Sequence, residues 1–155
     1  MAVTVWRLVK ARYADRPLDG EGARRFGGRW NARGTPMVYL GGSLSLAALE
    51  IFVHVSSDDS RLSFVAIPVE VPDGVAVEAL EETRLPPAWR EEPPPDDCKR
   101  LGSEWVAAGR TALLRVPSVI VPEEHNYLLN PTHADAARLR VGKTRPFGFD
   151  KRMWK

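Results

Sequence analysis

Segment 37–55 constrains the fold of this chain most strongly, because it combines a short strand, a tight turn and an apolar helix. Residues 37–40 are predicted to form a strand, which two successive glycines end. Ser43 then offers an N-cap for a helix over residues 44–55. This helix is apolar on nearly every side, which is typical of a helix buried in a core. Glu50 in its middle therefore needs a partner or a function.

Strands alternate with a few helices along the rest of the chain. Alternating or β-branched runs predict further strands over residues 3–9, 61–71, 111–116 and 119–121, with one or two more in 138–153. Helices are predicted over residues 97–108, where Gly109 is the stop, and near 133–139, where Thr132 and Asp135 resemble a capping box. The fold class that follows is α+β, with a single domain over residues 1–155, mixed or antiparallel sheets and flanking helices.

Two segments are predicted to be irregular. Residues 14–34 contain five glycines and many charges, and residues 84–97 contain five prolines, which form a stiff surface loop. Pro68 removes a backbone donor from the strand over 61–71, so this strand is expected at an edge of a sheet or at a bulge.

Composition excludes several classes of protein. A chain of 155 residues is long enough for one domain with a sizeable core. No apolar run approaches the roughly 20 residues that a membrane span needs, and the N-terminus does not resemble a signal peptide. Cys98 is the only cysteine, which suits a reducing compartment, so we expect a cytoplasmic protein.

The net charge of +2 is unevenly distributed. Residues 1–35 carry eight basic and three acidic side chains, residues 138–155 carry seven and one, and residues 78–97 carry two and seven. Basic N- and C-terminal segments on either side of an acidic central segment are consistent with the binding of an anionic ligand. They are equally consistent with an ordinary solvated surface.

Several familiar motifs are incomplete in this chain. Gly20-Glu21-Gly22 lacks the third glycine of a dinucleotide fingerprint, and Gly142-Lys143-Thr144 lacks the first glycine of a phosphate-binding loop. The three histidines and Cys98 have no metal-ligand spacing, so no metal site is expected.

Five polar residues that lie beside or within apolar elements remain as candidates: Arg29, Tyr39, Glu50, Ser118 and Asn126. Arg29 also fits a solvated loop, Tyr39 also fits plain core packing, and Ser118 also fits a turn. Glu50 is the candidate that packing explains least, because an apolar helix seldom carries an unpaired carboxylate.

Together these residues resemble the RES domain, a family of bacterial toxins named for an arginine, a glutamate and a serine. The resemblance covers nearly the whole chain, and its specificity comes from the order and spacing of its pieces. These are Trp6-Arg7-Leu8, Gly28-Arg29-Trp30-Asn31, Val38-Tyr39-Leu40, Ala47-Ala48-Leu49-Glu50, Val116-Pro117-Ser118, Asn126 to His133 and Phe147 to Arg152. The proline-rich segment 84–97 has no confident match.

The resemblance implies a fold related to ADP-ribosyltransferases, with NAD⁺ as substrate and no separate cofactor. It makes Arg29, Glu50 and Ser118 the residues of the family name, with Tyr39 as a further catalytic residue and Asn126 in the NAD⁺-binding site. It also implies an antitoxin of the Xre helix-turn-helix type that covers the active site, a complex that allows a homodimer, and no direct contact with nucleic acid or membrane.

The implied reaction, cleavage of the nicotinamide–ribose bond, needs neither a metal nor a nucleophile from the protein. Nicotinamide leaves as a neutral molecule while the ribose gains oxocarbenium character. Glu50 would hydrogen-bond ribose hydroxyls and stabilise the developing cation, and Arg29 would clamp the phosphates or the ribose through its planar fork. Tyr39 would offer a flat face to nicotinamide, and Ser118 a hydroxyl to its amide or to the ribose.

The acceptor of the ADP-ribose group is left open. Water gives a glycohydrolase and inorganic phosphate a phosphorylase, and we favour these two over a protein side chain, which gives an ADP-ribosyltransferase. A nucleic-acid-binding module is an alternative of another class, because arginines interleave with Phe26 and Trp30 and the C-terminal residues are basic. An inactive scaffold that only binds its antitoxin is a third alternative, against which Arg29, Tyr39 and Glu50 together argue.

Overall fold

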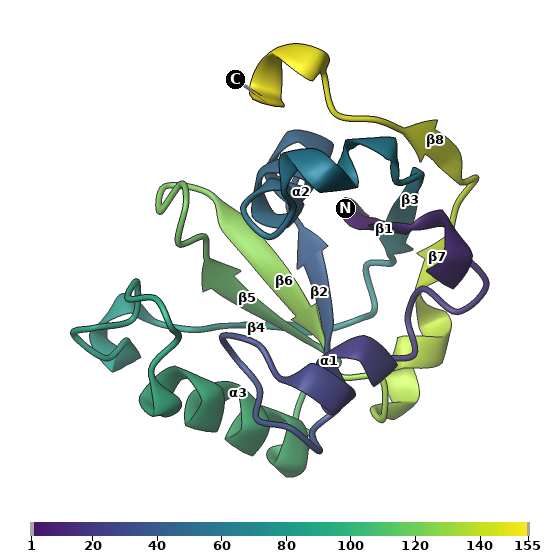
Figure 1. Ribbon diagram of the computed structural model, residues 1–155. Coiled ribbons are helices and arrows are strands. Elements are labelled where there is room, and N and C mark those ends of the chain that lie inside the picture. Colours follow the sequence, from purple (N-terminus) through teal and green to yellow (C-terminus); the bar gives the residue numbers. More distant parts are fainter. Residues whose placement is uncertain (1, 155) are drawn as a thin grey trace.

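The computed structural model describes residues 2–154, and within them eight strands form one sheet (Figure 1). The order across the sheet is β4-β5-β6-β2-β1-β3-β7, and β8 pairs with β3. All pairs are antiparallel except β4 with β5, so the predicted α+β class with a mixed sheet is confirmed. The strands are β1 (Val3–Lys10), β2 (Val38–Gly41), β3 (Phe64–Val71), β4 (Val77–Ala79), β5 (Leu113–Pro117), β6 (His125–Leu129), β7 (Arg140–Val141) and β8 (Arg145–Phe147).

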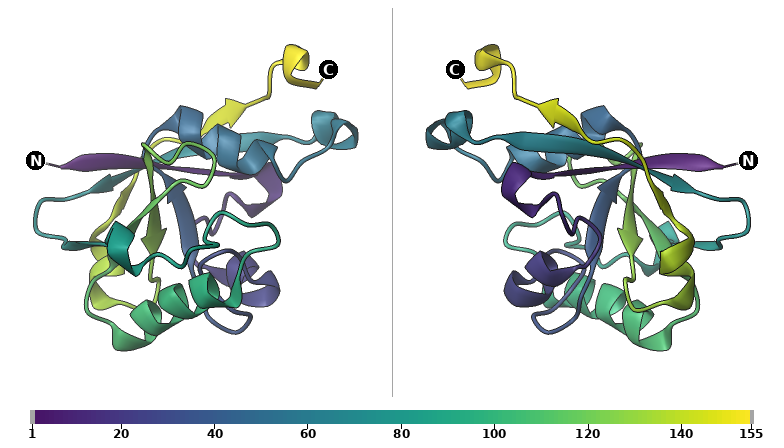
Figure 2. Two further views of the ribbon diagram at one scale, coloured as in Figure 1. Left: turned by 90° about the vertical axis from the view of Figure 1, so that its left-hand side faces the viewer. Right: turned by 90° about the vertical axis from the view of Figure 1, so that its right-hand side faces the viewer.

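The sheet consists of two halves that meet at a single pair of residues. In one half β1 pairs with β3 along its whole length, and in the other β2, β6 and β5 lie side by side. Between the halves, β1 and β2 pair only at Trp6 and Gly41. The two side views show β1 and β3 running nearly across the direction of β2 and β6 (Figure 2). The sheet is therefore strongly curled, as the twist of β-strands favours.

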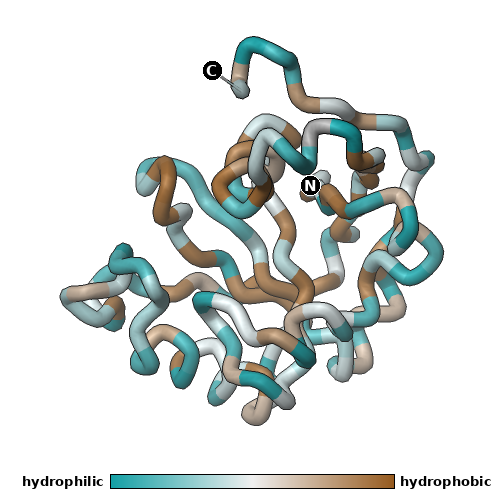
Figure 3. The backbone as a smooth tube through the Cα atoms, in the orientation of Figure 1, coloured by the Kyte–Doolittle hydropathy of each residue, from teal (hydrophilic) through white to brown (hydrophobic). Residues whose placement is uncertain are grey.

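A different helix covers each half on one face of the sheet. α2 (Leu44–Phe52) packs over β1 and β3, and α3 (Asp96–Ala108) packs over the half that contains β5 and β6. The opposite face carries one continuous apolar cluster, with Val5, Leu40 and Leu129 among its members. Apolar, brown segments follow the strands in Figure 3. Within the described residues no helix is long and apolar enough to cross a membrane.

Short helices connect the larger elements. α1 (Glu21–Phe26) lies inside the segment that the sequence predicts to be irregular, because a six-residue helix that contains a glycine leaves little periodic signal. The predicted helix near 133–139 is a 3-10 helix, and its N-cap is His133, so the capping box expected from Thr132 is wrong. The 3-10 helices are η1 (Ala11–Tyr13), η2 (Ser57–Arg61), η3 (Glu82–Arg84), η4 (Ala134–Arg138) and η5 (Lys151–Trp154).

The structure confirms the predicted end of α3 and the predicted buried face of β3. α3 ends before Gly109, which adopts the left-handed conformation with φ 64°. β3 buries the predicted apolar face, which includes Ile67 and Val69. The expected edge position of this strand is wrong, because β3 lies inside the sheet between β1 and β7. Pro68 lies between the residues of β3 that pair with β7 and those that pair with β8, where the missing N–H has no ladder partner to lose.

The predicted strand over 119–121 is wrong, and these residues form a bend. The Oγ atom of Ser118 accepts hydrogen bonds from the backbone N–H groups of Ile120 (3.1 Å) and Val121 (3.0 Å). Such side-chain bonds compete with the backbone ladder that a strand requires. The next strand is β6, and neither β6 nor β4 is among the predicted strands.

α2 is shorter and less buried than its apolar sequence predicts. It ends at Phe52 instead of residue 55, and within it only Leu46 and Ala47 are buried. Leu49 is 37% exposed, because the sheet covers just one side of the helix. An apolar sequence therefore does not by itself establish that a helix is surrounded by protein.

The contact that positions α2 is made at Gly41, the last residue of β2. A Cβ atom at this position would lie 2.7 Å from the backbone N of Ala47 and 2.9 Å from its Cα. The absence of a side chain thus lets α2 lie directly on the strand. Ser43 fixes the start of the helix, because its Oγ accepts a hydrogen bond from the Leu46 N–H at 3.1 Å.

Replacing Gly41 with alanine tests this contact. The Gly41→Ala variant is expected to lose about 1–3 kcal/mol of unfolding free energy, because the new methyl group meets backbone atoms that cannot move independently of the helix. Urea unfolding measures the loss. Gly22→Ala is the matched control: a Cβ there meets nothing within 4 Å, so its stability should stay equal or rise slightly. Equal stability of Gly41→Ala and the wild type would contradict the proposed role of this contact.

Candidate active site

Glu50 is placed by the contact between α2 and β2. Ala47 lies on Gly41, and Glu50 follows three residues later on the same side of the helix. Asn126 in β6 pairs with Gly41, so its side chain is directed to the same face of the sheet. Asn126 Nδ2 donates a hydrogen bond to Glu50 Oε1 at 2.7 Å. The half-buried carboxylate therefore bridges the helix and the strand.

Ser118 supplies a second hydrogen bond to the same oxygen of Glu50. Ser118 directly follows β5 and is fully buried, and its Oγ donates to Glu50 Oε1 at 2.6 Å. The same Oγ accepts the N–H groups of Ile120 and Val121. A hydroxyl has one hydrogen and two lone pairs, so protein groups use the whole hydrogen-bonding capacity of Ser118.

Two oxygen atoms of this cluster have no donor among the described residues. Asn126 Oδ1 is buried and accepts no hydrogen bond from them. Glu50 Oε2 accepts none either, but it is not fully buried. A buried acceptor without a donor costs about 1–3 kcal/mol, and native proteins keep few of them. The cluster can therefore accept hydrogen bonds from a ligand that carries hydroxyl groups.

Tyr39 lies on the same face of the sheet, two residues before Gly41 in β2. Its hydroxyl donates to Asn31 Oδ1 at 2.6 Å and accepts from the Trp30 N–H at 3.1 Å. Burial raises the pKa of Tyr39 above its ordinary value, so the phenol stays neutral at physiological pH. Tyr39 thereby attaches the loop over residues 27–35 to the sheet.

Asn31 organises that loop from within. It is fully buried, and its Nδ2 donates to the carbonyl oxygens of Ala23 (2.8 Å), Thr35 (3.0 Å) and Ala32 (3.2 Å). The sequence alone predicts no role for Asn31, because an asparagine in a charged, glycine-rich segment resembles any loop residue. Its importance becomes visible only through its burial and its bond to Tyr39.

The loop is also fixed to α3. A Cβ at Gly102 would lie 1.7 Å from the carbonyl oxygen of Trp30, so only glycine allows this approach. Ser103 Oγ accepts a hydrogen bond from the Ala32 N–H at 3.1 Å, and Lys99 Nζ donates to the Gly28 carbonyl oxygen at 3.1 Å. The backbone that carries Arg29 is thus held by both the sheet and a helix.

Arg29 reaches the proline-rich loop, which in the structure runs over residues 85–95 between η3 and α3. Its Nη1 donates to the carbonyl oxygens of Trp89 (2.9 Å) and Glu91 (2.8 Å), and its Nη2 donates to Glu92 Oε2 at 2.9 Å. The Arg29 side chain is 15% exposed, whereas that of Glu92 is 70% exposed. These bonds use three of the five N–H donors of the guanidinium, so Arg29 can also bind an anion from solvent.

The structure brings three of the five predicted site residues into direct contact, namely Glu50, Ser118 and Asn126. Arg29 and Tyr39 make no hydrogen bond to this cluster within the described part of the chain. They form a neighbouring group, in which the positive charge of Arg29 acts on the Tyr39 phenol. The candidate site therefore has two parts, one anionic and one cationic.

Arg7 is a half-buried residue for which the sequence alone predicts no role. It lies in β1, and its Nε donates to the Pro17 carbonyl oxygen at 3.1 Å and its Nη1 to that of Tyr39 at 3.3 Å. Burial lowers the pKa of Arg7 to about 10, while the charge of Asp19 opposes this shift. An arginine within an apolar strand is a sequence signal that could have identified it.

A comparison of folds finds a structure that matches nearly the whole chain. A chain in the crystal structure of the M. tuberculosis MbcT-MbcA toxin-antitoxin complex superimposes with a TM-score of 0.76, over 96% of this chain and 85% of that chain. The sequences are 19% identical, so this match concerns the fold alone. It defines the fold class, a small α+β domain.

Sequence comparisons then identify the family. The RES domain matches residues 4–150. A protein of Sphingobium sp. (strain YBL2), called Prs ADP-ribosylating toxin, is 43% identical over 157 residues, which cover 99% of this chain and 98% of the relative. Proteins called Toxin Res from Photorhabdus laumondii and Yersinia enterocolitica are 36% and 35% identical, over 97% and 96% of this chain and 97% and 98% of their own lengths. The chain belongs to the RES domain family and is a toxin of that family.

Removing the Tyr39 hydroxyl tests whether it attaches the loop. Tyr39→Phe is expected to lose about 1–3 kcal/mol of unfolding free energy at neutral pH, because Asn31 Oδ1 and the Trp30 N–H lose their partner. The folded-state pKa of Tyr39 lies above the unfolded value of about 10, so this stabilisation is present below that pH and is lost as the pH rises beyond it. Urea unfolding below and above this pH measures the difference in unfolding free energy between the wild type and Tyr39→Phe, and this difference should become smaller as the pH rises. The exposed Tyr13→Phe is the control, and an equal loss in both variants would contradict the assignment.

Proposed function

We propose that this toxin is an enzyme that depletes NAD⁺ by cleaving the bond between nicotinamide and ribose. The observation that carries the proposal is the Glu50 carboxylate, which Ser118 and Asn126 hold through one oxygen while the other stays free. A relative that is 43% identical is called an ADP-ribosylating toxin, and ADP-ribosylation breaks this same bond. Family membership and site chemistry thus support the same class of reaction.

A ribose supplies the donors that the anionic part of the site lacks. Two neighbouring hydroxyl groups of the nicotinamide ribose would donate to Glu50 Oε2 and Asn126 Oδ1, the two acceptors without a donor among the described residues. The negative charge of Glu50 would then lie beside a ribose that becomes cationic as nicotinamide leaves. The carboxylate would stabilise the transition state more than the ground state, as catalysis requires.

Ser118 takes a positioning role in this scheme. Its hydroxyl is fully used by Glu50 and two backbone N–H groups, so it would keep Oε1 in place while Oε2 binds the substrate. This differs from the expectation that the Ser118 hydroxyl bonds nicotinamide or ribose directly.

Arg29 would bind the phosphates of the dinucleotide. Two carbonyl oxygens of the proline-rich loop orient its fork, and the remaining partner, Glu92, is exposed and can be displaced by a phosphate oxygen. Charge-assisted bonds between guanidinium and phosphate are among the strongest hydrogen bonds in proteins. Tyr39 would act through the loop that carries Arg29, because its hydroxyl already has two protein partners.

Water or inorganic phosphate is the acceptor that we propose. A second candidate function, transfer of ADP-ribose to a protein, is favoured by the name of the Sphingobium relative, an ADP-ribosylating toxin. We further propose an antitoxin of the Xre helix-turn-helix type as partner, which covers the active site. The M. tuberculosis chain with the same fold was crystallised in a toxin-antitoxin complex.

Neutralising Glu50 tests the reaction. Glu50→Gln keeps the shape and the oxygen that Ser118 and Asn126 bind, but it removes the negative charge, so NAD⁺ consumption should fall at least about 100-fold. Circular dichroism should show an unchanged fold. Glu104→Gln on the exposed side of α3 is the matched control and should retain full activity. Undiminished consumption by Glu50→Gln would refute the role of the carboxylate.

Product analysis distinguishes the three acceptors. The purified protein, incubated with NAD⁺, should release nicotinamide together with ADP-ribose, or with phosphorylated ADP-ribose when inorganic phosphate is added. Mass spectrometry identifies these products. If nicotinamide is released only when a protein substrate is present, and ADP-ribose is found on that protein, the transferase is correct and NAD⁺ degradation is wrong.

A further inference from the structure

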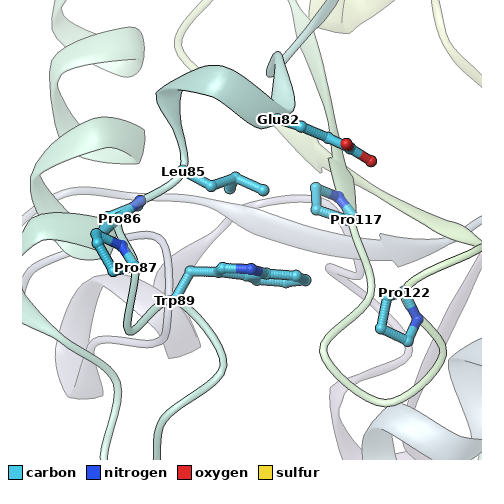
Figure 4. Close-up of a pocket in the computed structure, with 7 residues that line it drawn as sticks. All are labelled: Glu82, Leu85, Pro86, Pro87, Trp89, Pro117 and Pro122. Atoms are coloured by element: carbon cyan, nitrogen blue, oxygen red, sulfur yellow. The ribbon is translucent and has the colours of Figure 1, made fainter.

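A cavity of about 400 Å³ adjoins the candidate active site and has no part in the reaction described above. One wall is the proline-rich loop with Leu85 and Trp89, and the other contains Pro117 and Pro122 from either end of the bend after β5. Figure 4 shows the Trp89 indole edge-on, with one face toward Leu85 and Glu82. This cavity, called the slot below, is thus lined mostly by apolar side chains and by one flat indole ring.

Both parts of the candidate site adjoin this slot. Pro117 is followed directly by Ser118, which belongs to the anionic part, and the backbone carbonyl of Trp89 accepts a hydrogen bond from Arg29, which belongs to the cationic part. Arg90 ties the two walls together, because its Nε donates to a carbonyl oxygen of the bend after β5 at 3.1 Å. Residues that line the slot are therefore next to residues of both parts of the site.

The chemistry of the walls favours a planar ring with an amino group. An indole face stacks on a nucleobase, and such stacking contributes about 1–3 kcal/mol per base. Prolines and Leu85 can cover the rest of a ring without requiring hydrogen bonds. Among the described residues that line the slot, Glu82 is the one with a charge, and a carboxylate accepts hydrogen bonds from an amino group.

We propose that this slot binds the adenine ring of NAD⁺, stacked on Trp89 with its amino group directed to Glu82. This inference rests on the proposed function, because it takes NAD⁺ as the substrate. The dinucleotide would then extend from adenine at Trp89, through its phosphates at Arg29, to the nicotinamide ribose at Glu50.

The nicotinamide ring is the competing occupant, and its charge argues against it. Nicotinamide is cationic in NAD⁺ and becomes neutral when the bond breaks. An indole face and a carboxylate would bind the cation most tightly before the reaction, by cation–π and ionic attraction, and this would raise the barrier. Adenine is neutral throughout, so its binding anchors the substrate without opposing bond cleavage.

Removing the indole tests the stacking. Trp89→Ala should raise the KM for NAD⁺ at least about fivefold, and Trp89→Phe, which keeps an aromatic face, should restore most of the affinity. Nicotinamide mononucleotide is the control substrate, because it contains the same reacting bond but no adenine. Its turnover by Trp89→Ala should equal that by the wild type.

Changing Glu82 tests the contact with the amino group. The wild type should prefer NAD⁺ over nicotinamide hypoxanthine dinucleotide, in which a carbonyl oxygen replaces the amino group and would face the carboxylate. Glu82→Gln should reduce this preference at least about fivefold, because an amide can also donate to that oxygen. Glu81→Gln, the exposed neighbour, is the matched control and should keep the wild-type preference.

The possible outcomes separate this inference from the proposed function. If the wild type consumes no NAD⁺, the proposed function fails. If it consumes NAD⁺, but Trp89→Ala impairs both substrates equally or neither, the adenine site is wrong. An unchanged preference in Glu82→Gln would likewise overturn the assignment of the amino group. The slot is supported as the adenine site if Trp89→Ala is impaired with NAD⁺ but not with nicotinamide mononucleotide, and if Glu82→Gln has a reduced preference for NAD⁺ over nicotinamide hypoxanthine dinucleotide.

Discussion

The close contact between Gly41 and Ala47 determines how the rest of the structure is arranged around the site. Because Gly41 has no side chain, α2 lies directly on the strand that joins the two halves of the sheet. Glu50 follows Ala47 by three residues, and Asn126 is the cross-strand partner of Gly41, so their side chains meet. One backbone approach thus sets the position of the carboxylate.

Around this contact, protein groups form hydrogen bonds to some polar atoms of Glu50 and Arg29 and leave other polar atoms of these side chains for a ligand. Ser118 and Asn126 hold one oxygen of Glu50, and carbonyl oxygens of the proline-rich loop hold one nitrogen of Arg29. The unsatisfied amide oxygen of Asn126 carries a cost in folding free energy, of the kind that proteins retain at functional sites. The geometry is therefore preorganised for a substrate with hydroxyl and phosphate groups.

Much of the fold follows from local sequence patterns, and the errors have local physical causes. The strand and helix around Ser43 are found correctly because their signals, a cap and an apolar run, are short-range. The strand predicted over 119–121 is wrong because Ser118 takes the N–H groups that a ladder would need. The burial of α2 is overestimated because an apolar sequence does not reveal how many sides of a helix the sheet covers.

The sequence by itself determined the fold class, the family resemblance and Glu50 as the residue that packing explains least, because propensity, capping and buried charge act locally. Only the tertiary structure decided that Ser118 is saturated by protein groups, that Arg29 is oriented by the proline-rich loop, and that Asn31 organises the loop before Tyr39. These roles depend on hydrogen bonds between residues up to 68 positions apart. Such partners are chosen by how the two halves of the sheet meet, and no local pattern in the sequence records that choice.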